Sequence, residues 1–163
     1  MSGVSQPTPL AAAQHRAQAL HDAGDHAGAR QLLTQAIETA QRTVGLGKDH
    51  PDVLAAAHLL AQWHRAADDP AAARRVLEEA LADGQQRWGD AHPLMLGLSF
   101  ELGTVAEELG NRHEARRNFT RVATHGPGVL GANHWQVRAA RDYLGDAAPA
   151  PAGPPTPTPP VAA

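Results

Sequence analysis

The chain has 163 residues and a formal net charge of −3, from 14 Lys and Arg against 17 Asp and Glu, and it contains no Cys. The missing cysteines exclude disulfides, thiol nucleophiles and thiolate metal ligands, and the mildly acidic balance argues against a nucleic-acid partner. Alanine and leucine supply most of the 42% hydrophobic content and aromatic residues only 4%, which predicts an all-α protein.

The N-terminal stretch MSGVSQPTPL has neither the charged nor the apolar region of a secretory signal. No run of residues approaches the ~18 apolar positions that a membrane span needs. We therefore expect a cytoplasmic protein without membrane association, beginning with a flexible N-terminus at residues 1–9. One lysine against 13 arginines suggests a GC-rich, bacterial source.

Helix-start signals recur along the chain. Asp69 is an N-cap candidate followed by proline, and Asn111 with Glu114 three residues later forms a capping-box pattern. Pro51 and Pro93 also stand where a first helical turn should begin. The pattern predicts helices at about 10–22, 25–43, 51–66, 70–87, 93–109, 112–124 and 134–144.

A glycine-proline-glycine sequence, Gly126-Pro127-Gly128, falls where the second helix of the third repeat would be finishing. Proline cannot donate the backbone hydrogen bond of a helix interior, and glycine lowers helix propensity. We therefore expect this helix to stop early and an irregular loop to continue to Asn133.

A repeat of 42 residues organises the chain. The segments GKDHP (47–51), GDAHP (89–93) and GANHW (131–135) are spaced by 42 residues, and the first repeat carries two extra residues before Gly47. Each unit has a small residue, a turn residue and then an alanine with apolar residues at helical spacing, which predicts two antiparallel helices that touch through small side chains. The matched triplets are Ala17, Ala61 and Gly103; Gly24, Asp68 and Gly110; Ala29, Ala73 and Ala115; and Leu33, Leu77 and Phe119.

The composition changes after Gly145. Seven of the 17 residues in AAPAPAGPPTPTPPVAA, 147–163, are proline, which cannot form a packed core and favours an extended polyproline II chain. We expect residues 146–163 to be a disordered tail, and the alternative of a PxxP-type ligand stays open.

These positions resemble the tetratricopeptide repeat, in the 42-residue variety of kinesin light chains and bacterial repeat proteins. The segment 50–81 carries the resemblance most fully. It implies a right-handed α-solenoid of three antiparallel helix pairs and a C-terminal capping helix, with a repeat domain at 10–145. The repeats would span about 10–50, 51–92 and 93–133, and the capping helix 134–144.

The resemblance also implies a function, because this family is a protein-interaction scaffold whose first helices line a concave groove. We expect a protein or peptide partner in that groove, no catalysis, and possible homo-oligomers through an exposed apolar end of the stack. Helix 94–103 is so apolar that part of it should exceed what the core needs. The groove positions would be Gln14, Gln18, His21, His58, Gln62, Arg65, Phe100, Thr104, Glu107 and Glu108.

The 10 histidines leave a His-dependent enzyme or a metal-binding protein as the alternative. The sequence contains no HExxH motif and no two histidines four residues apart. His50, His92 and His134 would lie ~10 Å apart in successive repeats, too far to share a zinc ion. We expect them to cap or pack the linkers, and we expect no catalytic residues, metal site or cofactor.

Overall fold

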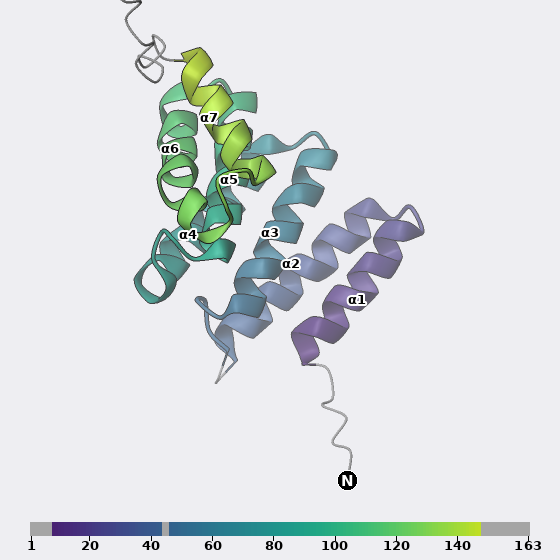
Figure 1. The fold of residues 1–163 in the computed structure, drawn as a ribbon. Coiled ribbons are helices and arrows are strands. Elements are labelled where there is room, and N and C mark those ends of the chain that lie inside the picture. Colours follow the sequence, from purple (N-terminus) through teal and green to yellow (C-terminus); the bar gives the residue numbers. More distant parts are fainter. Residues whose placement is uncertain (1–7, 44–45, 148–163) are drawn as a thin grey trace, which may run out of the picture.

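The computed structural model describes residues 8–43 and 46–147, which form helices and no strand. Consecutive helices pack against each other as antiparallel pairs, and α3 also contacts α1 and α5 directly (Figure 1). The all-α class and the three pairs with a closing helix are as predicted. The helices are α1 (Pro9–Asp22), α2 (His26–Arg42), α3 (Pro51–Ala66), α4 (Pro70–Trp88), α5 (Pro93–Glu108), α6 (Arg112–Val129) and α7 (Trp135–Ala147).

Most of the flexible N-terminus predicted at 1–9 and of the tail predicted at 146–163 lies outside the described residues. Residues 8–9 cap and begin α1, and residues 146–147 end α7. Among the described residues, no helix combines the length and the apolar character that crossing a membrane requires.

The recurring histidines are helix caps. His50, His92 and His134 each accept, through Nδ1, a hydrogen bond from the backbone amide two residues later, at 3.1, 3.1 and 3.2 Å. These bonds satisfy amides that have no partner within the first turn of α3, α5 and α7. The predicted capping role is confirmed, because each imidazole uses its Nδ1 atom on its own helix.

Side-chain caps also begin the second helix of each pair. Asp69 accepts a bond from the amide of Ala72 at 3.1 Å, and Asn111 accepts one from the amide of Glu114 at 3.1 Å. The turn before each cap needs a left-handed residue. Asp68 occupies it with a φ of 59°, where the other two pairs use glycine.

The helices of each pair approach closely at small residues. Ala17 and Ala29 in the first pair, and Ala61 and Ala73 in the second, are fully buried. In the third pair, a Cβ built on Gly103 would lie 3.0 Å from the ring of Phe119. The large apolar residue of that pair therefore packs where the glycine leaves room, as the repeat pattern predicted.

The predicted early stop of the sixth helix is wrong, because α6 runs through Pro127 to Val129. Gly126 is buried against α7, where an added Cβ would lie 2.7 Å from Cγ2 of Val137. The amide of Leu130 donates to the carbonyl of Gly126 at 2.7 Å and closes the last turn beyond the proline. Packing between α6 and the fully buried Val137 offsets the backbone bond that Pro127 cannot make.

The predicted apolar surplus on helix 94–103 is limited to Leu94 and Phe100, which are half-buried. Met95, Leu96, Leu98 and Leu102 are no more than 3% exposed. The reason is that α5 packs against α3, α4 and α6 at once, so that almost every side of this helix belongs to the core.

The stack is closed at α7 by a change of residue type at fixed repeat positions. Positions that are buried in α3 and α5 face solvent in α7, which has no following partner helix among the described residues. The equivalent residues, 42 apart, are Leu54, Leu96 and Arg138, and Ala57, Ser99 and Arg141.

Candidate interaction groove

The odd-numbered helices, here called the inner helices, present rows of side chains at equivalent repeat positions. The spacing is 44 residues between α1 and α3, which includes the two extra residues of the first repeat, and 42 thereafter. One row is small, and the two beside it are mainly polar. The small row is Ala11, Ala55, Gly97 and Ala139; the next is Gln14, His58, Phe100 and Asp142; the third is Gln18, Gln62 and Thr104.

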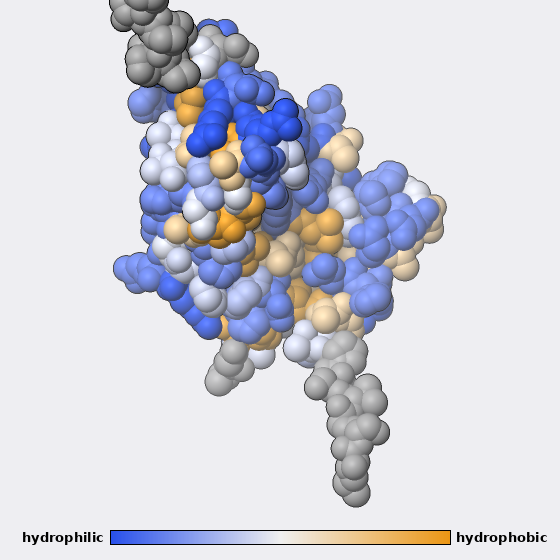
Figure 2. All heavy atoms as spheres, in the orientation of Figure 1, coloured by the Kyte–Doolittle hydropathy of each residue, from blue (hydrophilic) through white to orange (hydrophobic). Residues whose placement is uncertain are grey.

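The N-terminal part of this surface is hollowed between α1 and α3. A cavity of about 430 Å³ is lined by seven residues, Leu10, Ala11, Gln14, His15, Gln18, Asp52 and Ala55. Figure 2 shows apolar surface in the hollow between α1 and the α5–α7 end of the molecule. Gln18 donates a hydrogen bond to Asp22 at 2.9 Å, so its amide is held in place beside the cavity.

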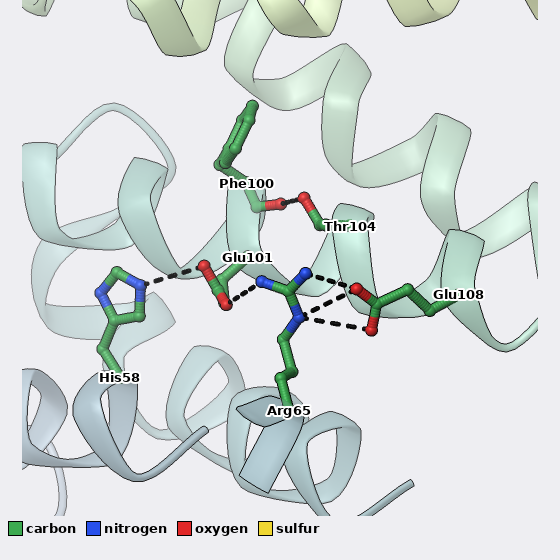
Figure 3. A network of polar contacts seen from close by, with 6 residues as sticks. All are labelled: His58, Arg65, Phe100, Glu101, Thr104 and Glu108. Carbon is green, nitrogen blue, oxygen red and sulfur yellow. Dashed lines mark hydrogen bonds and ion pairs between the residues drawn. The ribbon is translucent and has the colours of Figure 1, made fainter. Parts of the chain in front are cut away.

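The centre of the groove is a charged network between α3 and α5 (Figure 3). Arg65 donates from Nη1 to Glu101 at 2.7 Å, and from Nε to both oxygens of Glu108 at 3.1 and 3.3 Å. Its Nη2 also donates to Glu108. These bonds, chiefly those to Glu108, raise the pKa of the guanidinium above its ordinary value.

Glu101 is the buried member of this network, with 8% of its surface exposed. Burial disfavours its charged form, but His58 and the hydrogen bond from Arg65 outweigh that effect and hold its pKa below the usual value. Nε2 of His58 lies 3.6 Å from Oε2 of Glu101 and, although buried, has no hydrogen-bond partner among the residues that the structure describes. The carboxylate therefore depends on Arg65 for its strongest contact.

The C-terminal part of the groove is aromatic at one end. The ring of Phe100 meets Phe119 edge-on at 5.5 Å between centroids and Trp135 at 5.1 Å. At the other end, the Tyr143 hydroxyl donates to Glu107 at 2.6 Å. Burial and, to a lesser extent, this carboxylate raise the pKa of Tyr143. These contacts close the junction between α5 and α7.

Some of the groove residues predicted from the sequence have side chains that can contact a partner, and the others are held by contacts with neighbouring side chains. Gln62 is exposed, and Gln14 and Thr104 are half-buried, so their side chains can contact a partner. His21 stacks on Trp63 with 4.7 Å between ring centroids. The remaining residues, Gln18, His58, Arg65, Phe100, Glu107 and Glu108, are tied to neighbours as described above.

Three residues of the groove were missed by the sequence reasoning. Glu101 and Tyr143 make the contacts between inner helices, and Trp135 is the most exposed large hydrophobic residue of the described chain at 63%. One signal could have found Trp135, because it replaces the proline of the GxxHP segments in GANHW. Within residues 8–43 and 46–147, no group of three His, Asp or Glu side chains is arranged to hold a metal ion.

Comparison with known proteins gives matches in a family model and in solved structures. Residues 9–86 match the family model described as tetratricopeptide repeat. Two crystal structures show the nearly identical TPR-like repeats of a protein described as a kinesin light chain from Podosopora anserina, the second with one substitution.

Both structures are 25% identical in sequence to this chain, with TM-scores of 0.71 and 0.73 over 88% and 86% of its length. The chain spans 67% and 66% of their lengths, about two thirds of each. A comparison with curated proteins found no match.

Proposed function

Because this chain is a tetratricopeptide-repeat protein, we propose that it is an interaction module that binds an extended peptide segment of a protein partner along the inner helices. The repeats of this family are general protein-interaction scaffolds, and the proposal places the binding surface on the three rows defined above. The module performs no chemistry of its own and acts by holding its partner.

The observation that supports this surface is the small row. Ala11, Ala55, Gly97 and Ala139 occur at one repeat position on all four inner helices, where a longer side chain would fill the groove. A peptide backbone laid on such a row can come close enough to hydrogen-bond to the neighbouring side chains. Gln14 and Gln62 supply donors and acceptors for that purpose, and the Thr104 hydroxyl, which donates to the carbonyl of Phe100, supplies an acceptor.

The central network sets a limit on what the groove accepts. Arg65 is the cation that a carboxylate clamp would need, but its charge is already paired with both Glu101 and Glu108. A partner's carboxylate would have to compete with these two, which makes the centre of the groove unfavourable for an acidic tail.

Peptide display tests the proposal. Binders are selected from a random-peptide library on the wild-type protein and then measured on two matched pairs of variants. Gln62→Arg and Ala55→Arg place an arginine in the groove, whereas Gln86→Arg and Ala82→Arg make the same changes at exposed positions of α4. We expect groove variants to lose about tenfold or more in affinity and α4 variants to keep it, with circular dichroism confirming that all four fold.

Binders that tolerate the groove variants, or lose as much on the α4 variants, would place the binding surface elsewhere. Self-association is not part of this proposal. At the C-terminal end of the described stack, Arg138 and Arg141 occupy positions that are buried in earlier repeats, and two such ends would repel each other.

A further inference from the structure

One end of the junction between α5 and α7 carries a tryptophan, Trp135, whose side chain is only partly covered by the rest of the protein. Trp135 is 63% exposed although its ring packs edge-on against Phe100. The other exposed large hydrophobic residues of the described chain, Leu109 and Val129, are 39% and 43% exposed. An exposed tryptophan supported by a second aromatic ring is the kind of side chain that dominates binding energy at interfaces.

The other end of the same junction is acidic. Glu107 is exposed, and within the described part of the chain it receives only the Tyr143 hydroxyl, a neutral donor, so no cation there pairs with its negative charge. Glu108 stands beside it on α5, whereas Glu101 lies six residues back along the helix, next to Phe100, and both pair with Arg65. Glu107 and Glu108, with one guanidinium that is also shared with Glu101, leave an excess of negative charge at this end.

Two arginines of α6 also influence this junction electrostatically. Arg112 and Arg116 lower the pKa of Tyr143 through space, against the effects that raise it. A cation brought by a partner is therefore most favoured where it approaches Glu107 away from these two arginines.

The distance between the two ends sets a spacing for a bound peptide. Phe100 and Glu107 are seven residues apart on α5, and a helix rises ~1.5 Å per residue, which places them ~10 Å apart along the axis. An extended peptide covers ~10 Å in three residues. The residues between the two ends, Thr104 on α5 and Ala139 on α7, have short side chains and are both half-buried. They leave room for a peptide to pass between the two ends.

We propose that the segment recognised at the α5–α7 junction carries a large apolar residue and, three positions away, an arginine or lysine. The apolar residue packs on Trp135 and Phe100, and the cation pairs with Glu107. This inference rests on the proposed function and adds the chemistry of the partner, a basic segment with an apolar anchor.

Defined peptides test it on the full chain. The probes are ten-residue Gly/Ser peptides that contain Leu-Ser-Ser-Arg or its reverse, Arg-Ser-Ser-Leu. Matched controls contain Leu-Ser-Ser-Glu and Leu-Arg-Ser-Ser, which change the charge and the spacing. The readout is the indole N–H resonance of Trp135 in a ¹⁵N-labelled protein, which is distinguishable because Trp63 is buried and Trp88 donates its N–H to the carbonyl of Asp49.

We expect at least one orientation of the arginine peptide to shift the Trp135 resonance, and both controls to shift it less at equal concentration. With fluorescently labelled peptide, Glu107→Gln should weaken binding by about two- to fivefold, and Trp135→Ala by about tenfold or more. The matched control is Glu79→Gln, at an exposed position of α4, which should leave the affinity for the peptide unchanged.

Equal or tighter binding of the glutamate peptide, or full affinity in Glu107→Gln, would overturn the inference. So would the absence of any Trp135 shift with both arginine peptides. If the display selection still yields groove-dependent binders in that case, the proposed function stands and only the partner chemistry is wrong.

Discussion

Tyr143 donates a hydrogen bond to Glu107 across the junction of α5 and α7, and the two residues lie 36 positions apart in the sequence. The junction of α3 and α5 is closed by Arg65 and Glu101, also 36 apart, at 2.7 Å. Consecutive junctions of inner helices therefore use the same two repeat positions with different chemistry. An ion pair holds the earlier junction, and a neutral hydroxyl bonded to a carboxylate holds the later one.

Replacing Arg65 should cost more stability than replacing Glu101. Arg65→Ala leaves the buried carboxylate of Glu101 without its strongest donor, and a buried charged group that loses its partner costs about 1–3 kcal/mol or more. Glu101→Gln removes the buried charge and leaves Arg65 paired with Glu108. We expect a clearly smaller loss, measured as the free energy of unfolding in urea.

The double variant tests whether the unpaired charge of Glu101 explains why Arg65→Ala should cost more stability than Glu101→Gln. If the orphaned charge is the cause, Arg65→Ala combined with Glu101→Gln should be less destabilised than the sum of the two single variants. Strict additivity would show that Arg65 stabilises the chain through Glu108 or through packing of its aliphatic stem instead.

The repeat pattern was enough to predict the fold because it places small and large apolar residues at positions that only stacked helix pairs can bury. Ala61, Ala73 and Leu77 are each nearly or fully buried, as their spacing required. The caps at His50 and Asp69 follow from local backbone chemistry and were equally accessible from sequence.

The missed features depend on contacts between repeats. Nothing in the local sequence around Glu101 indicates that this residue is buried. Only the packing of α3 against α5 brings Arg65 within hydrogen-bonding distance of it. Pro127 shows the same limit for secondary structure, because local propensity ends the helix there while packing of Gly126 on Val137 continues it. Sequence periodicity within one repeat carries neither contact.

His64 should make stability depend on pH near neutrality. Burial, chiefly, lowers its pKa, and the charges of Arg30 and Arg75 add to that effect while Asp69 opposes it. As the pH falls below the unfolded-state pKa of about 6.5, the unfolded chain binds a proton before the folded chain does. The free energy of unfolding should therefore decrease with falling pH until the lower folded-state pKa is passed.

The measurement is the difference between wild type and His64→Gln in urea midpoints from pH 8 to pH 5. We expect the variant to lose less stability than wild type over this range, because glutamine does not titrate. Parallel profiles for the two proteins would mean that other histidines carry the pH dependence.

Two glycines of α6 should respond oppositely to the same substitution. Gly126→Ala places a methyl group 2.7 Å from Val137, and overpacking of this kind costs about 1–3 kcal/mol. A Cβ on Gly128 meets nothing within 4 Å, and its backbone is helical. Gly128→Ala should therefore be neutral or stabilise by up to about 1 kcal/mol.

Thermal unfolding followed by circular dichroism distinguishes the two variants. If α6 ended before Pro127 in solution, Gly126 would not pack against α7. Gly126→Ala would then cause little loss of stability. A large loss with Gly126→Ala and none with Gly128→Ala supports the continuous helix.

The arginines of α7 should keep the C-terminal end of the stack from associating. Leu54 and Leu96 are 1% and 0% exposed, and their equivalent, Arg138, is exposed, as is Arg141 at the position of Ala57 and Ser99. The double change Arg138→Leu and Arg141→Leu recreates the apolar face that α3 and α5 bury against a following helix, but leaves it in solvent. Such a patch favours self-association, so the variant should gain mass with increasing concentration in light scattering while wild type does not.

The control is the double change Arg138→Lys and Arg141→Lys, which keeps the charge and should behave as wild type. Association of the lysine variant as well would mean that geometry specific to arginine, and not charge, protects this end.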